Sequence, residues 1–117
     1  MKTNFMGKEI SGQFTIPSGI VTTNTKVIKK IMEEIPEIGI ITTKSIGPEQ
    51  RAGNREPIIT QYAPGCFMNA VGLTNPGYKE FAKQLSELKI PKDKFLLISI
   101  FGGNEKEFVE VAKELAP

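Results

Sequence analysis

Apolar positions along this chain follow two spacings, one typical of amphipathic helices and one typical of buried strands. Residues 23–37, 75–90 and 104–117 repeat apolar side chains at helical spacing, so each is predicted to form a helix with one buried face. Residues 38–46 and 95–103 are short runs rich in apolar and β-branched side chains. Such runs are typical of strands buried on both faces of a parallel sheet.

Capping residues fix where the predicted helices begin and end. Thr23 or Asn24 is suited to cap the first helix, and Pro36 ends it. Pro76 is expected in the first turn of the second helix, and Asn104 is expected to cap the third.

The remaining segments are predicted to form hairpins or short strands. Residues 3–6 and 9–17 flank Gly7-Lys8 and predict a hairpin whose second arm continues as the first strand of the sheet. Residues 57–73 predict one or two short strands in an excursion after the strand at 38–46.

The order of these elements predicts an α/β domain over residues 1–117, in which a hairpin is followed by about three strand–helix units. Two architectures fit this order. One is an open, doubly wound sheet, and the other is a portion of a (β/α)₈ barrel. In both, chemistry gathers at the carboxyl ends of the parallel strands.

Composition narrows the possible functions. The net charge is +2 without a basic block, which argues against a nucleic-acid surface. No histidine is present, so imidazole catalysis and histidine metal ligation are excluded, and the single cysteine rules out both an internal disulfide and a zinc cluster. We expect no metal site and a reducing, cytoplasmic setting. No apolar run is long enough to cross a membrane.

Polar and glycine residues follow each predicted strand. Lys44 lies at a strand end, where its ammonium is placed to meet either an anionic ligand or solvent. Gly102, Gly103 and Asn104 open a helix, which favours a tight turn over an anion site. Asn69 lies among apolar residues, so we expect a buried amide held by backbone or reserved for a ligand.

Several apolar side chains are expected in the core. With no histidine to act as a base, Cys66 is interpreted as a small packed side chain rather than a nucleophile. The other expected core residues are Met6, Phe67, Met68 and Phe101.

Four motifs in this order resemble those of one enzyme family. They are Ser18-Gly19 after a strand, Thr43-Lys44-Ser45, a loop at residues 49–55 containing Gly53-Asn54, and the segment 69–77, which reads Asn-Ala-Val-Gly-Leu-Thr-Asn-Pro-Gly. The chain resembles the N-terminal part of the dihydroorotate dehydrogenases, closest to the FMN-dependent class 1 form that pairs with an iron–sulfur/FAD electron-transfer subunit. The resemblance implies a (β/α)₈ (TIM) barrel and FMN-dependent oxidation of dihydroorotate to orotate in pyrimidine biosynthesis.

The resemblance also implies roles for individual residues. Ser18 and Gly19 would lie against the FMN ring, and Ser45 would contact the flavin. Lys44 would be the catalytic residue of this part of the chain, contacting both flavin and substrate.

The segment after the excursion would bind the substrate. Asn69, together with the backbone of Gly72 and Leu73, would hold the pyrimidine ring, and Asn75 would support that loop.

A barrel of this kind needs roughly 250 residues. We therefore expect 1–117 to be an incomplete domain that does not hold FMN tightly and that works with a C-terminal barrel portion or by self-association. Two alternatives remain. The chain is a non-catalytic remnant or one chain of a split barrel, or it belongs to a related flavin-dependent dihydropyrimidine dehydrogenase.

Overall fold

The computed structural model describes residues 2–116. Its centre is a sheet of parallel strands in the order β3 (Phe14–Ile16), β4 (Ile38–Thr42) and β7 (Phe95–Leu97). Each strand is followed by a helical segment, as the hydrophobic pattern predicts. The mixed α/β class expected from the sequence is therefore present, with β4 in the middle of the parallel sheet.

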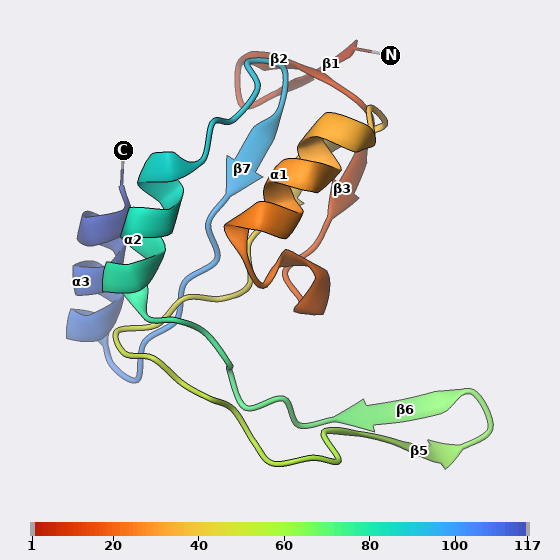
Figure 1. The fold of residues 1–117 in the computed structure, drawn as a ribbon, viewed down its shortest axis with the longest axis vertical. Coiled ribbons are helices and arrows are strands. Elements are labelled where there is room, and N and C mark those ends of the chain that lie inside the picture. The colour runs from red at the N-terminus through yellow and green to blue at the C-terminus, as the bar shows by residue number, and fades with distance from the viewer. Residues whose placement is uncertain (1, 117) are drawn as a thin grey trace.

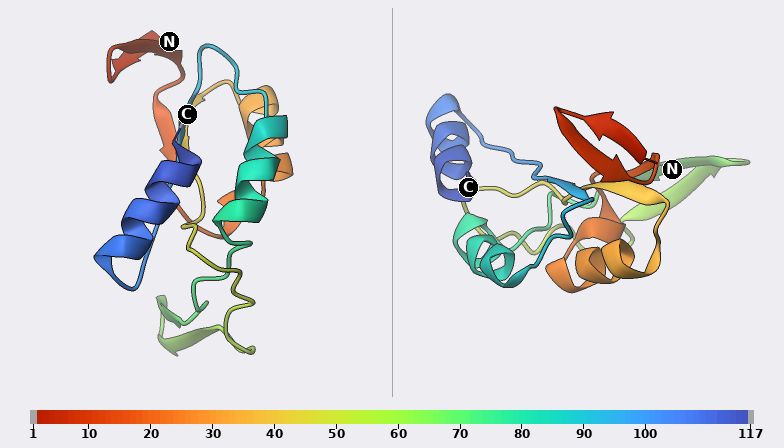
Figure 2. Two further views of the ribbon diagram at one scale, coloured as in Figure 1. Left: turned by 90° about the vertical axis from the view of Figure 1, so that its left-hand side faces the viewer. Right: turned by 90° about the horizontal axis from the view of Figure 1, so that it is seen from above.

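The helices form an arc on one side of this sheet (Figure 2). They are α1 (Thr25–Glu34), α2 (Tyr78–Glu87) and α3 (Glu105–Leu115). Asn24 caps α1 by accepting a hydrogen bond from the amide of Val27, and Asn104 caps α3 in the same way through Glu107. None of the helices described in residues 2–116 is long and apolar enough to cross a bilayer.

Two hairpins stand at opposite ends of the parallel sheet (Figure 1). The β1 (Lys2–Phe5) and β2 (Lys8–Ser11) hairpin lies at the amino end of the strands, and the β5 (Ile59–Ala63) and β6 (Cys66–Asn69) hairpin lies beyond their carboxyl ends. The second hairpin is the excursion predicted for residues 57–73. Gly65, with φ of 74°, follows Pro64 in its turn, the sequence that a type II turn requires.

Two boundaries differ from the prediction. The second arm of the first hairpin does not run through to residue 17, because the chain bends at Gly12 and separates β2 from β3. Gly12 has φ of 95°, and a Cβ there would approach the Glu37 carbonyl oxygen to 2.5 Å. Pro76 lies before Gly77, the N-cap of α2, rather than inside the first helical turn.

Helices and strands bury their apolar faces in two clusters. One joins α1 to β4 through Ile28, Ile31, Met32 and Ile41. The other joins α2 and α3 to the segment after β4, through Phe81, Val111 and Ile46 among others.

Burial on both faces of the strands was predicted but is incomplete. Gly39 and Ile41 in β4 are buried while Ile40 and Thr42 are half-buried, and Phe14 in β3 is exposed. The helices lie on one side of the parallel sheet, so they cover only one of its faces (Figure 2).

Candidate functional site

The carboxyl ends of β3 and β4 bring their polar residues together through the turn that follows β3. This turn, Ile20–Thr22, is a short 3-10 helix preceded by Ser18 and Gly19. The amide of Lys44 donates a hydrogen bond of 3.0 Å to the carbonyl oxygen of Thr22. The residues after β4 are thus tied directly to the residues after β3.

A cavity of about 580 Å³ opens at this end of the sheet. Its size is in the range of pockets that hold small organic ligands. Its lining comes from three segments that are distant in sequence: Ser18, Gly19, Lys44, Ile59, Asn69, Ala70, Val71, Gly72 and Leu73.

The polar side chains in this cavity are left without partners. Within residues 2–116, the Lys44 ammonium, the Ser18 hydroxyl and the Asn69 side-chain amide make no hydrogen bond or ion pair. A Cβ added to Gly19 would meet no atom within 4 Å, so that face of the backbone is open. A cation, a hydroxyl, an amide and bare backbone together suit a planar, polar and anionic ligand.

The loop after β6 adds backbone donors to the same cavity. Gly72 and Leu73 have positive φ values of 81° and 54°, and neither amide N–H donates a hydrogen bond within the described part of the chain. Positive φ is uncommon for leucine and turns its amide out of the usual strand geometry. These two N–H groups are therefore available to donate hydrogen bonds to a carbonyl or carboxylate oxygen of a ligand.

Asn75 holds this loop in place. It is buried, its Oδ1 accepts hydrogen bonds from the amides of Gly47 and Gly77, and its Nδ2 donates to the Leu73 carbonyl oxygen at 2.8 Å. Backbone bonds between Asn75 and Arg51 join the same loop to the segment after β4. The expected support from Asn75 is present as a set of hydrogen bonds.

Ser45 is placed differently from the other predicted site residues. It does not line the 580 Å³ cavity, and its hydroxyl lies 2.8 Å from the hydroxyl of Ser99 after β7. The neighbouring Thr43 is fully buried and accepts a hydrogen bond from the Ser99 amide. In this structure, Ser45 therefore connects β4 to β7, and its contact with flavin stays a prediction.

The hairpin of β5 and β6 corrects several expectations about burial. Asn69 is exposed rather than buried, and Cys66, expected as a packed side chain, is exposed. Phe67 and Met68 on the same strand are exposed as well, and so is Met6 in the turn of the first hairpin. The β5–β6 hairpin extends away from the helices (Figure 1), and nearly all of its side chains are exposed. In the first hairpin Met6 is exposed, whereas Ile10 of β2 is buried. Phe101 is half-buried beneath the Arg51 guanidinium, 5.2 Å from its ring centre.

Sequence reasoning missed Ile59, Ala70 and Val71 as lining residues. Ile59 reaches the cavity because it pairs with Asn69 across the hairpin. Ala70 and Val71 lie within the motif at residues 69–77, but only Asn69, Gly72 and Leu73 of that motif were assigned to the site. Ile59 could not be found, because the short strands predicted in residues 57–73 had no defined register.

The glycines after β7 do not provide a free anion site. The Gly103 amide donates a hydrogen bond of 2.7 Å to Oε2 of Glu107, and the Asn104 side chain donates to Oε1 of the same carboxylate. The α3 helix thus binds its own carboxylate at its amino end, as a tight, capped turn.

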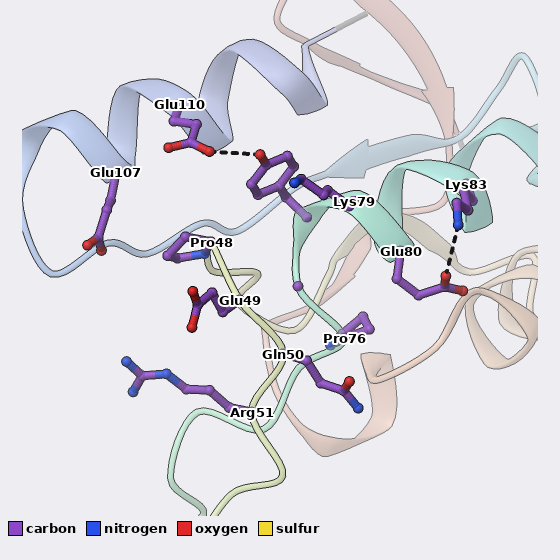
Figure 3. A pocket seen from close by; sticks show the side chains of 12 residues that line it. Pro48, Glu49, Gln50, Arg51, Pro76, Lys79, Glu80, Lys83, Glu107 and Glu110 are labelled. Carbon is purple, nitrogen blue, oxygen red and sulfur yellow. Dashed lines mark hydrogen bonds and ion pairs between the residues drawn. The ribbon is translucent and has the colours of Figure 1, made fainter.

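A second cavity, of about 730 Å³, shares no lining residue with the first (Figure 3). It lies between the loop Pro48–Arg51 and the helices α2 and α3, and its lining mixes carboxylates such as Glu107 with cations such as Lys79. Beside it the Tyr78 hydroxyl donates a 2.7 Å hydrogen bond to Glu110 of α3, which raises the pKa of Tyr78. Burial and the nearby charges of Glu110 and Glu114 raise this pKa further.

Comparison with known proteins gives a consistent result. The family model described as dihydroorotate dehydrogenase matches residues 1–117. Similar relatives are named dihydroorotate dehydrogenase B (NAD(+)), catalytic subunit. The relative from Methanocaldococcus jannaschii is 34% identical over 98% of this chain and 38% of its own length. The relative from Thermococcus kodakarensis is 36% identical over 99% of this chain and 37% of its own length.

A third relative with the same name, from Methanosarcina mazei, is 34% identical over 95% of this chain and 35% of its own length. The chain thus spans little more than a third of these relatives. Together with the motifs in residues 18–77, these matches show that the chain belongs to the dihydroorotate dehydrogenase family.

Proposed function

We propose that this chain forms the N-terminal part of a (β/α)₈ barrel that oxidises dihydroorotate to orotate with FMN. The observation that carries the proposal is one cavity lined by a lysine, an asparagine and two backbone N–H groups, none of which has a hydrogen-bond or ion-pair partner among residues 2–116. Orotate carries a carboxylate and several ring carbonyl and N–H groups. A cation, an amide and backbone donors are the groups that recognise such a ring.

The residues present suit the ring of FMN better than its phosphate. Gly19 offers open backbone against which a planar ring can lie, and Ser18 and Lys44 offer unpaired polar groups beside it. When bound, FMN supplies the acceptor for the hydride that leaves C6 of dihydroorotate. Its phosphate carries about two negative charges and needs a helix amino end or a glycine nest. The α3 amino end is occupied by Glu107.

Lys44 would act by electrostatics. Its ammonium would offset the charge of the substrate carboxylate and the negative charge that the flavin ring gains on reduction. Asn69 would bind the pyrimidine through its side-chain amide, and Gly72 and Leu73 would bind it through their N–H groups. The two sides of the substrate would then be held by different segments, one after β4 and one after β6.

The rest of the site would come from chain outside these residues. Relatives are more than twice as long as residues 1–117, and we propose that the remaining barrel supplies the base that removes the proton from C5 and the phosphate site. The relatives are named as catalytic subunits, which supports a partner that carries electrons onward. We propose an iron–sulfur/FAD subunit for that role.

Reconstitution tests this proposal. Residues 1–117 are co-expressed with the portion of the Methanocaldococcus jannaschii relative that has no counterpart here, and flavin absorbance is followed after dihydroorotate is added. The proposal predicts yellow protein that is bleached by dihydroorotate. Yellow protein that dihydroorotate does not reduce, but that uracil-type dihydropyrimidines reduce, would favour the related dihydropyrimidine dehydrogenases.

Substitutions in the reconstituted protein then test the role proposed for each residue. Lys44→Ala is expected to retain flavin and to slow its reduction by roughly 10²-fold, the usual scale for removing one electrostatic stabiliser. Asn69→Ala is expected mainly to raise KM, because this amide contacts substrate. Lys26→Ala is the matched control, since Lys26 is an exposed lysine of α1 without an ion pair among the described residues. An unchanged rate in Lys44→Ala would remove Lys44 from the mechanism.

A further inference from the structure

Thr22 lies at the junction of the two segments that carry the proposed site. It is fully buried, although it is polar and lies in a surface turn between β3 and α1. Its hydroxyl accepts a hydrogen bond from the Gly19 amide at 3.3 Å and donates one to the Gly19 carbonyl oxygen at 3.2 Å. Its amide bonds the same carbonyl oxygen.

The main chain of Thr22 continues this connection to the next strand. Its carbonyl oxygen accepts the hydrogen bond from the Lys44 amide at 3.0 Å. The side chain of one buried residue therefore fixes the backbone of Gly19, and its carbonyl fixes the backbone of Lys44. Within residues 2–116, Gly19 and Lys44 make no hydrogen bond directly to each other.

The geometry points to Thr22 as a positioning residue that sets the distance between the open backbone of Gly19 and the ammonium of Lys44. This inference rests on the proposed function, because the two groups matter together only if one ligand touches both. Placement matters for such a pair, because an offset of about 1 Å can reduce a rate by orders of magnitude. Thr22 lines neither cavity, so it acts through its two neighbours.

Hydrogen exchange in the 117-residue chain tests the inference directly. Thr22→Val keeps the shape of the side chain and removes the hydroxyl. We expect the Gly19 amide, which loses its acceptor, to exchange about tenfold faster, the scale of losing one ordinary hydrogen bond. The Lys44 amide keeps the Thr22 carbonyl oxygen as its acceptor and should exchange faster only as far as the turn shifts. Thr22→Ser keeps the hydroxyl and should retain the slow exchange, even if loss of the methyl group lowers global stability.

Ile31→Val is the matched control. Ile31 is buried in the cluster that joins α1 to β4, and its apolar side chain takes no part in the hydrogen bonds that hold the Gly19 turn. In Ile31→Val, amide exchange at Gly19 and Lys44 should change only as much as the global free energy of unfolding does. Equal exchange at the Gly19 amide in Thr22→Val and wild type would overturn the inference. If Thr22→Val does not fold, fast exchange at Gly19 in Thr22→Ser would overturn it.

A second measurement uses the reconstituted flavoprotein. Flavin reduction by dihydroorotate should slow about tenfold in Thr22→Val, recover in Thr22→Ser and stay unchanged in Ile31→Val. If wild type shows no flavin reduction at all, the proposed function fails, and exchange at Gly19 and Lys44 still decides whether Thr22 holds them together. A Thr22→Val flavoprotein that reduces at the wild-type rate would contradict the positioning role.

Discussion

Lys94 shows how a charged residue can be built into the interior of this chain. It is only 4% exposed, and its ammonium donates hydrogen bonds to the carbonyl oxygens of Ser11, Pro36 and Ile38. These carbonyls come from the end of β2 and from the start of β4. The lysine therefore holds the amino edge of the sheet together without any carboxylate among the described residues.

Replacing Lys94 by methionine should be strongly destabilising. The substitution keeps the length of the side chain but leaves three carbonyl oxygens without their donor, and we expect a loss of about 2–4 kcal/mol in the free energy of unfolding. Urea denaturation measures it. Lys92→Met is the matched control, because Lys92 is exposed and makes no ion pair or hydrogen bond within residues 2–116, and its stability should stay near wild type.

Tyr78 gives this fold a dependence on alkaline pH. Its pKa is raised in the folded chain, chiefly by the hydrogen bond to Glu110. A raised pKa means that the folded state holds the phenol proton more tightly than the unfolded state does. The resulting stability is fully present below the unfolded value of about 10 and is lost as pH rises through the higher folded value.

The Tyr78→Phe variant tests this dependence. It should be less stable than wild type at neutral pH, and the difference should shrink as denaturation is repeated at increasing pH above 10. Tyr62→Phe removes the hydroxyl of an exposed ring that makes no hydrogen bond within residues 2–116, and this variant should match wild type at neutral pH. If the difference in free energy of unfolding between wild type and Tyr78→Phe stays the same at high pH, stability does not depend on the Tyr78 proton in this way.

The sequence predicted which residues gather at the site better than it predicted their environment. Ser18 and Lys44 follow parallel strands, and the carboxyl ends of parallel strands share one edge, so their proximity follows from topology alone. Asn69 was expected to be buried because its neighbours in sequence are apolar, and it is exposed. Burial depends on whether another element covers a strand, and local composition does not report that.

The hairpin of β5 and β6 behaves as a separate element. The two strands pair with each other and with no other strand in the described chain, and nearly all of their side chains are exposed. The sequence predicted one or two short strands in an excursion over residues 57–73. It did not predict that the pair would extend away from the sheet.

A glycine substitution should loosen this hairpin alone. Gly65 has φ of 74° with no atom near its Cβ position, so Gly65→Ala adds backbone strain without a clash, at a cost of about 1–2 kcal/mol. Amide exchange should accelerate in β5 and β6 and stay unchanged in β4. Gly7→Ala is the counterpart in the first hairpin, where φ is 79°, and should affect β1 and β2 instead. Faster exchange in β4 caused by Gly65→Ala would show that the hairpin is coupled to the sheet.

At the scale of the whole molecule, apolar surface is left uncovered on several elements. Exposed side chains include Phe14 on β3, Tyr62 on β5 and Phe67 on β6, with Val109 on α3. Large exposed apolar patches mark surfaces that other protein chains cover. This agrees with a chain that spans about a third of its relatives.

Residues 1–117 alone should not retain FMN. The 580 Å³ cavity offers Lys44 as its cation, and the amino end of α3 is taken by Glu107, so the phosphate lacks a site here. Dialysis followed by flavin absorbance measures retention, with the reconstituted protein as the positive control. Near one FMN per isolated chain after dialysis would contradict this expectation.

The cavity is lined by residues from two parts of the structure, the packed sheet and the β5–β6 hairpin, and this division affects the free energy of ligand binding. Lys44 stands on the packed sheet, whereas Ile59 and Asn69 stand on a hairpin with little packing of its own. A ligand that contacts both must restrict the hairpin when it binds, and part of its contact energy is offset by the entropy of that ordering. Any substitution that stiffens the hairpin in its present position should therefore tighten binding without touching the ligand. We therefore expect the affinity for a ligand in this cavity to depend on the rigidity of the hairpin as well as on the side chains that contact the ligand.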